Sequence, residues 1–174
     1  MAKIRGYIAT SLDGYIADRD GKLDWLFAYN DVDFGEHGYT RFARSVRTIV
    51  MGRTTYDFIA EQPTPWAYEG HRVIIVTSRP IENPRGKLET RHDVDELIAE
   101  LRALADGDVW MMGGSKLLSA FLDRGSLDDI EIYVMPELVG GGTPLFSPTG
   151  LRLSPRLNEA KPLSRGCVFL RYSF

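Results

Sequence analysis

Short apolar runs alternate with amphipathic stretches along the chain, which is the pattern of an α/β protein. Runs rich in Ile, Val and Met predict buried strands, and apolar residues spaced three and four apart predict helices. The strands are expected at 4–10, 48–51, 72–77, 109–112 and 130–135. The helices are expected from Asp33 toward Ser45, at 54–60, after Asp93 or Asp95, and at 115–122.

The apolar pattern also indicates how these strands are arranged. Residues 73–76 are four consecutive β-branched apolar residues, which favours a strand buried on both faces. Near the end of the chain, residues 151–163 and 167–172 alternate between apolar and polar side chains, as in an antiparallel hairpin. We therefore expect one domain over residues 1–174, with a mixed, mostly parallel central sheet and a C-terminal antiparallel hairpin.

Composition narrows the classes of function. The chain has 174 residues, 44% of them hydrophobic and 26% charged, with a net charge of -3, so an overall attraction to nucleic acid or to an anionic membrane is not expected. The single cysteine, Cys167, excludes an intramolecular disulfide and a multi-cysteine zinc site. The three histidines have no metal-ligand spacing, so no metal is expected. Without a signal peptide or a long apolar run, the prediction is a cytoplasmic protein.

Two predicted strands end in glycine immediately before a predicted helix. These turns are Gly52-Arg53-Thr54-Thr55 and Gly113-Gly114-Ser115-Lys116. The first N–H groups of a helix have no intrahelical partner and, with the helix dipole, favour an anion such as a phosphate. Neighbouring parallel strands would place both turns at one edge of the sheet, where α/β proteins bind ligands. Each turn taken alone is more often a simple tight turn than a phosphate-binding site.

A third strand end supplies further groups that bind phosphate. Thr77-Ser78-Arg79-Pro80 offers two hydroxyl groups and a guanidinium. If Arg53 and Arg79 converge, they favour a nicotinamide dinucleotide that carries a 2′-phosphate. The alternative is that both are solvated surface arginines.

Five motifs occur in an order that resembles the dihydrofolate reductase-like superfamily. They are residues 8–17, 50–56, 76–80, 112–115 and 140–146. The resemblance covers nearly all of the chain and is strongest to the riboflavin-biosynthesis reductase branch (the RibD C-terminal domain), as a stand-alone, bacterial-type member. It implies a dihydrofolate reductase-like three-layer fold whose eight-stranded sheet binds NADPH across its carboxyl edge.

The resemblance also assigns cofactor-binding residues. Ala9 and Ile16 would lie along the nicotinamide, and residues 11–17 would close over it as a lid. The residues implied to hold the phosphates are Gly52, Arg53, Thr54 and Thr55, with Thr77, Ser78 and Arg79 at the adenosine 2′-phosphate and Gly113, Gly114, Ser115, Lys116 and Leu117 at the pyrophosphate.

The substrate side is less completely defined. Counting back from Gly52 as in dihydrofolate reductases places their helical carboxylate at Glu36, which borders an apolar helical stripe. Buried there, Glu36 would have a raised pKa and act as the catalytic general acid; the alternative is a solvated charge. Trp25 is either a substrate-pocket wall or a core aromatic, and Tyr133 either faces the substrate or packs in the core. The Trp-Leu-Pro element of true dihydrofolate reductases is absent, and Leu23-Asp24-Trp25-Leu26 stands in its place.

The predicted function is an NADPH-dependent reductase that transfers hydride to a small pteridine or ribosylaminopyrimidine, most like 5-amino-6-(5-phosphoribosylamino)uracil reductase. The acceptor would be a pterin-like carbon–nitrogen double bond or an opened ribose aldehyde, with a proton from Glu36 or an ordered water. Dihydrofolate reductase activity and a nucleotide-binding module without turnover remain the alternatives. The partners expected are a small-molecule substrate and a second copy in a homodimer, for which the sequence identifies no interface.

Overall fold

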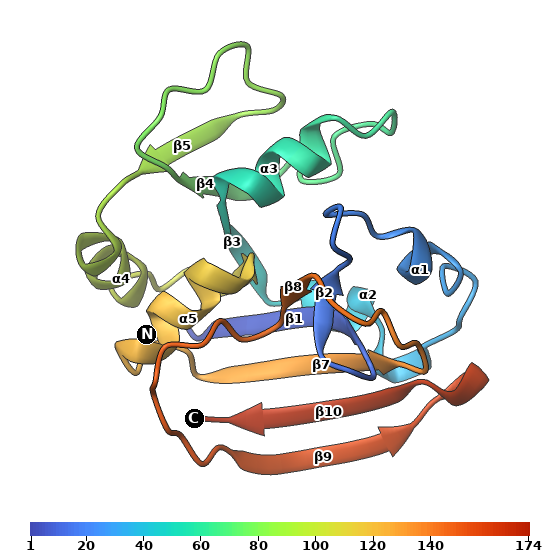
Figure 1. Ribbon diagram of the computed structural model, residues 1–174. Helices are drawn as coiled ribbons and strands as arrows, with labels where there is room; N and C mark the ends of the chain where they lie inside the picture. The colour runs from blue at the N-terminus through green and yellow to red at the C-terminus, as the bar shows by residue number, and fades with distance from the viewer.

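A computed structural model describes residues 1–174 and contains one eight-stranded sheet in the order β5-β4-β3-β6-β1-β7-β10-β9 (Figure 1). Neighbours from β5 to β7 are parallel, whereas β10 runs antiparallel to β7 and β9 antiparallel to β10. The strands are β1 Ile4–Ser11, β3 Val46–Gly52, β4 Arg72–Val76, β5 Leu88–Arg91, β6 Asp108–Gly113, β7 Asp129–Met135, β9 Arg156–Pro162 and β10 Val168–Ser173. The predicted mixed, mostly parallel sheet with a C-terminal hairpin is confirmed.

Helices cover both faces of the sheet. Because side chains alternate along a strand, the two faces carry different cores: Val50 of β3 packs with α4 and α5, whereas its neighbours Ile49 and Met51 pack with α2 and α3. The helices are α1 Asp24–Phe27, α2 Tyr39–Ala43, α3 Arg53–Ala60, α4 Val94–Arg102 and α5 Ser115–Asp123, with 3₁₀ turns η1 Gly35–His37 and η2 Ser164–Gly166. None of the helices combines the length and apolar character needed to cross a lipid bilayer.

A second, two-stranded sheet holds the loop that follows β1. Its strands are β2 Tyr15–Ala17 and β8 Thr143–Pro144, which pair antiparallel. The backbone at Gly142, where φ is +134°, lies so close to the backbone of β2 that a side chain there would collide with the carbonyl of Ala17. The pairing fixes residues 11–17 against the glycine-rich segment 140–142 at the carboxyl edge of β1.

The continuous helix expected from Asp33 to Ser45 is wrong. Asp33 does accept a hydrogen bond from the N–H of Gly35 at 2.7 Å, but only the short turn η1 follows. Gly38 is extended, with ψ at 171°, and α2 starts after it. Gly35 adopts a φ of +52°, which lies outside the helical range. Two glycines therefore divide the segment into two short pieces. The short helix α1 and the strand β5 were also absent from the prediction.

Candidate functional site

The two glycine turns meet at the carboxyl edge of the sheet. Strands β3 and β6 are parallel neighbours, and Met51 pairs with Gly113. A Cβ atom added to Gly52 would lie 3.8 Å from the carbonyl oxygen of Gly113, and one added to Gly114 would lie 3.4 Å from Oγ1 of Thr55. The structure thus brings together the turns that open α3 and α5, as the sequence pattern predicted.

The helices that begin at these turns have unsatisfied N–H groups. Neither α3 nor α5 has a side-chain cap, whereas the Asp93 carboxylate caps α4 by accepting from the N–H groups of Asp95 and Glu96. Gly113 has a φ of +101°, its peptide bond to Gly114 is cis, and a Cβ added to it would meet no atom within 4 Å. Two uncapped N-termini beside open space fit a bound diphosphate.

A third turn continues the site toward β5. The N–H of Thr77 donates to the carbonyl of Arg91 at 2.8 Å, which holds the ends of β4 and β5 together. Around this contact is a cavity of about 350 Å³ with no carboxylate and no hydrophobic side chain other than a proline in its lining. The lining residues are Thr77, Ser78, Arg79, Pro80, Thr90 and His92. This donor set of hydroxyls, a guanidinium and an imidazole fits a phosphate group.

Arg53 contacts the third turn through a backbone carbonyl and not through the side chain of Arg79. Arg53 donates from Nη1 to the carbonyl of Pro80 at 2.9 Å, and its Nε is 2.7 Å from Oδ1 of Asp57. Arg79 is exposed and forms no ion pair within the chain. Arg53 therefore shapes the turn, while Arg79 is free to meet a ligand.

Thr90 and His92 were missed by the sequence prediction because β5 was missed. Leu88-Glu89-Thr90-Arg91 contains only one strongly apolar residue, and its side chains are at most half-buried. The position of these residues depends on the parallel pairing of β5 with β4, in which Ile75 is the partner of Thr90. The local sequence pattern therefore gives almost no indication of β5.

The remaining residues predicted to hold the phosphates and the pyrophosphate differ in their exposure. Thr54 and Lys116 are exposed in the first turns of α3 and α5. Ser115 is buried, and its hydroxyl is 2.7 Å from that of Ser147. Leu117 is buried in the core, so only its backbone can face the turn.

The loop predicted to cover the nicotinamide is fastened by Asp13. This carboxylate accepts from the Ser11 hydroxyl at 2.6 Å and from the N–H groups of Gly140 at 2.7 Å and Val139 at 3.1 Å. The Ser11 hydrogen bond is the largest cause that lowers the pKa of Asp13. Ala9 on β1 and Ile16, which lies on β2 within this loop, are both half-buried.

Glu36 does not have the environment that its predicted role requires. Its side chain is 78% exposed, and Oε1 lies 3.2 Å from Nζ of Lys161. That hydrogen bond lowers the pKa of Glu36, whereas the expectation was a buried carboxyl with a raised pKa. The prediction failed because the helical wheel assumed a continuous helix that η1 and Gly38 interrupt.

Tyr133 and Trp25 belong to one aromatic cluster under α1 and η1. Tyr133 is 2% exposed and its hydroxyl donates to the backbone carbonyl of His37, so it cannot reach a substrate in this conformation. Trp25 is half-buried, packs against the same cluster, and has a buried Nε1 with no hydrogen-bond partner. Of the two predicted substrate residues, Trp25 alone has an unused polar atom.

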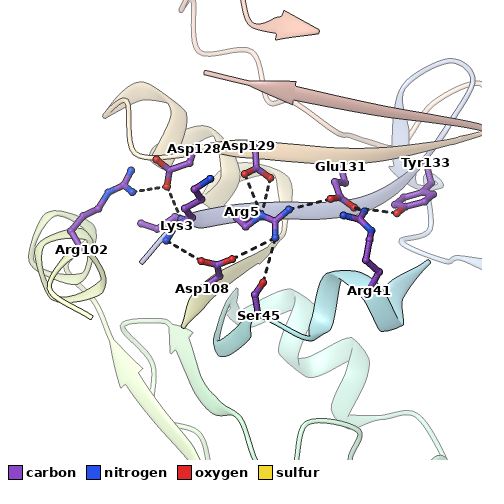
Figure 2. A network of polar contacts seen from close by, with 11 residues as sticks. Lys3, Arg5, Arg41, Ser45, Arg102, Asp108, Asp128, Asp129, Glu131 and Tyr133 are labelled. Atoms are coloured by element: carbon purple, nitrogen blue, oxygen red, sulfur yellow. Dashed lines mark hydrogen bonds and ion pairs between the residues drawn. The ribbon is translucent and has the colours of Figure 1, made fainter. Parts of the chain in front are cut away.

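A buried carboxylate, Glu131, joins this cluster to a polar network (Figure 2). Its side chain is fully buried between Arg5, at 3.2 Å, and Arg41 of α2, at 2.5 Å, and it lies 3.3 Å from the Tyr133 hydroxyl. Arg5 also binds Asp129 at 2.9 Å and Asp108 at 3.5 Å, at the starts of β7 and β6. The network lies toward the sheet edge opposite the glycine turns. It fastens α2 to the sheet and does not contact the proposed cofactor site.

Burial keeps the tyrosines near Glu131 protonated. It raises the pKa of Tyr7 to about 12 and raises that of Tyr133 as well.

No three His, Cys, Asp or Glu side chains come together as a metal-binding group.

Comparisons with known proteins identify the family of this chain. A profile of the RibD C-terminal domain matches residues 2–169. The chain belongs to the RibD C-terminal domain family. Among curated relatives, the uncharacterized protein YwjB of Bacillus subtilis is 31% identical over 167 residues, which cover 95% of this chain and 94% of YwjB.

Solved structures place this RibD C-terminal domain protein in a dihydrofolate reductase-like fold. A candidate riboflavin biosynthesis protein of Shewanella sp. PV-4 superposes with a TM-score of 0.86 at 32% identity, covering 99% of this chain and 98% of that one. Dihydrofolate reductase from Enterococcus faecalis, complexed with NADP(H), gives a TM-score of 0.62 at 18% identity, with 98% and 95% covered. The second likeness concerns the fold alone.

Proposed function

We propose that this protein is an NADPH-dependent reductase that acts on a small ribosylaminopyrimidine or pteridine. The observation that carries the proposal is the contact between the turns at Gly52 and Gly113, which places two uncapped helix N-termini side by side. The polar cavity at Thr77–Pro80 extends the same edge and favours the phosphorylated dinucleotide over NADH. Membership of the RibD C-terminal domain family supports the reductase class.

We assign a binding role to each part of this carboxyl edge of the sheet. The N–H groups that open α3 and α5 hold the diphosphate, with Thr54, Thr55 and Lys116 beside it. Ser78, Arg79, Thr90 and His92 hold the 2′-phosphate, and Arg53 keeps the turn at Pro80 in place. Ala9 and Ile16 flank the nicotinamide. NADPH, when bound, supplies the hydride.

Residues 11–17 orient the reactants and exclude water. The Asp13 carboxylate and the β2–β8 pairing hold this loop over the end of β1. A closed loop shields the hydride donor from water and keeps the acceptor in position. Trp25 Nε1, which is buried without a partner, is the donor that we assign to the substrate side.

The source of the proton separates the two acceptor classes. Glu36 is exposed and paired with Lys161, and its lowered pKa keeps it ionised at neutral pH. We therefore assign protonation to an ordered water. As the acceptor we favour the riboflavin-type substrate, a phosphoribosylaminopyrimidine, over dihydrofolate. Membership of the RibD C-terminal domain family also favours the riboflavin-type acceptor over dihydrofolate.

Titration and turnover test the proposal in sequence. Calorimetry with NADPH and NADH measures binding, and the absorbance of the reduced nicotinamide then follows turnover with 5-amino-6-(5-phosphoribosylamino)uracil or dihydrofolate. We expect tighter binding of NADPH and oxidation with the first acceptor. Oxidation only with dihydrofolate would identify a folate reductase, and binding without turnover a nucleotide module. No heat with either dinucleotide would refute the proposal.

A further inference from the structure

A short segment, residues 143–147, connects the loop 11–17 to helix α5. Its first part is β8, which pairs with β2 of that loop. The next residue, Leu145, is buried and donates its N–H to the carbonyl of Gly14 at 2.8 Å. Beyond this point the chain runs along α5 before it reaches β9 (Figure 1). The loop and the helix are therefore joined by one continuous stretch of backbone.

Ser147 ends this segment on one face of α5. Its hydroxyl is 2.7 Å from that of Ser115, and its N–H donates to the Ser119 hydroxyl at 3.1 Å. Ser115 and Ser119 are four residues apart, so their side chains share a helix face. Both are buried, at 4% and 5% exposed. Ser147 thus contacts both ends of the first turn of α5.

The same helical turn belongs to the proposed diphosphate site. Ser115 is the first residue of α5, and this helix has no side-chain cap. Its backbone N–H is among those at a helix start that have no intrahelical partner, whereas its hydroxyl is bonded to Ser147. Ser115 therefore serves the ligand through its backbone and the segment 143–147 through its side chain. A diphosphate that orders the backbone of this turn also restricts the Ser115 hydroxyl, and with it Ser147.

We propose that Ser147 is a positioning residue that couples the diphosphate site to the loop 11–17. A dinucleotide bound at α5 holds the Ser115 hydroxyl, and Ser147 passes this restriction through Leu145 and β8 to the loop, which becomes more ordered. Because the coupling of two sites is reciprocal, an ordered loop also strengthens dinucleotide binding. The inference rests on the proposed function, and it adds that water is excluded when the hydride donor is bound.

A ligand without a nicotinamide isolates this coupling. Adenosine 2′-phosphate 5′-diphosphate carries the 2′-phosphate and the diphosphate of NADPH, but it has no nicotinamide that could contact Ala9 or Ile16. Any change that it causes in the loop must pass through the protein. Hydrogen exchange of the full chain, measured by mass spectrometry, reports on the amides of residues 11–17. We expect this probe to slow their exchange about fivefold in the wild type, the size of effect that one neutral hydrogen bond supports.

Variants of Ser147 test whether the coupling passes through its hydroxyl. Ser147→Ala should lose the slowing, although calorimetry with the same probe still records binding, and Ser147→Thr should retain it. Ser119→Ala removes the acceptor of the Ser147 N–H and should also reduce the slowing. Ser126→Ala is the matched control and should respond as the wild type does, because Ser126 is buried and its hydroxyl donates to the carbonyl of Arg124, just beyond the other end of α5. Circular dichroism establishes that each variant is folded.

The outcomes separate this inference from the proposed function. If the probe binds the wild type but the exchange of residues 11–17 is unchanged, the coupling is refuted and the diphosphate site stands. The same holds if the exchange slows equally in Ser147→Ala. If the probe gives no heat with the wild type, the diphosphate site itself fails, and the coupling fails with it.

Discussion

Arg53 donates from Nη1 to the carbonyl of Pro80 across 2.9 Å, so the first residue of α3 is bonded to the turn after β4. Its Nε is occupied by Asp57, one helical turn further along α3. Arg79, in the same turn, has an exposed side chain without a partner. The two arginines therefore have separable effects: one holds the turn, and the other is free for a 2′-phosphate.

Arg79→Ala should selectively weaken NADPH. Loss of one charge-assisted contact, worth about 1.5 kcal/mol, raises the Kd of NADPH about tenfold, whereas the Kd of NADH should change less than about twofold. Arg53→Ala releases the turn as well, and the double variant should lose more affinity for NADPH than for NADH. Calorimetry with both dinucleotides measures these changes. Equal losses for both cofactors would reject the assignment of these arginines.

Gly113→Ala should block the proposed diphosphate site. The added methyl group would project into the space beside the turn, where no protein atom lies within 4 Å. Gly125→Ala is the matched control, since Gly125 also has a positive φ, +58°, and open space around it, but lies beyond the other end of α5. Both changes should cost about 1 kcal/mol of stability through backbone strain. Only Gly113→Ala should abolish detectable dinucleotide binding in calorimetry.

The parallel core was predictable because its apolar runs are unambiguous. Strand β4 is buried on both faces through Val73, Ile74 and Ile75. Of the two predicted cap residues, Asp93 and Asp95, Asp93 caps α4. The glycine turns were found because glycine followed at once by a helix is a local pattern. Their contact followed from the parallel pairing of β3 and β6.

The errors arose where tertiary pairing overrides local pattern. Glu36 was assigned by counting back from Gly52, and its burial was expected from a helical wheel. The positive φ of Gly35 and the extended Gly38 remove the helix on which that wheel depends. Thr90 and His92 reach the polar cavity only because β5 pairs with β4, and no apolar run marks β5. The burial of Glu131 depends on two arginines distant in sequence, Arg5 and Arg41.

Asp13→Asn should loosen the loop over the end of β1. The carboxylate accepts three hydrogen bonds, from Ser11, Val139 and Gly140, and a single amide oxygen cannot replace both carboxylate oxygens. We expect faster hydrogen exchange at the amides of Val139 and Gly140, measured by mass spectrometry, and a lower kcat. Asp20→Asn is the control, because the Asp20 side chain is exposed and forms no ion pair. Unchanged exchange in Asp13→Asn would show that the carboxylate does not fasten the loop.

Glu89→Gln should reduce stability at neutral pH but not in acid. Glu89 binds Arg72 at 2.6 Å and Arg91 at 2.9 Å, and chiefly the Arg72 hydrogen bond lowers its pKa from 4.5 to about 2. A carboxylate with a lowered pKa stabilises the fold above its unfolded pKa of 4.5, and this contribution is lost as the pH falls toward 2. Because the side chain is 40% exposed, solvent screening reduces the effect to about 1 kcal/mol.

Urea denaturation at pH values above 4.5 and close to 2 measures this difference. The free energies of unfolding of the wild type and Glu89→Gln should differ at the higher pH and converge at the lower one. Glu82→Gln, at an exposed glutamate without an ion pair, should show no difference at either pH. A gap between wild type and Glu89→Gln that persists in acid would mean that packing of the side chain, and not its charge, joins β5 to β4.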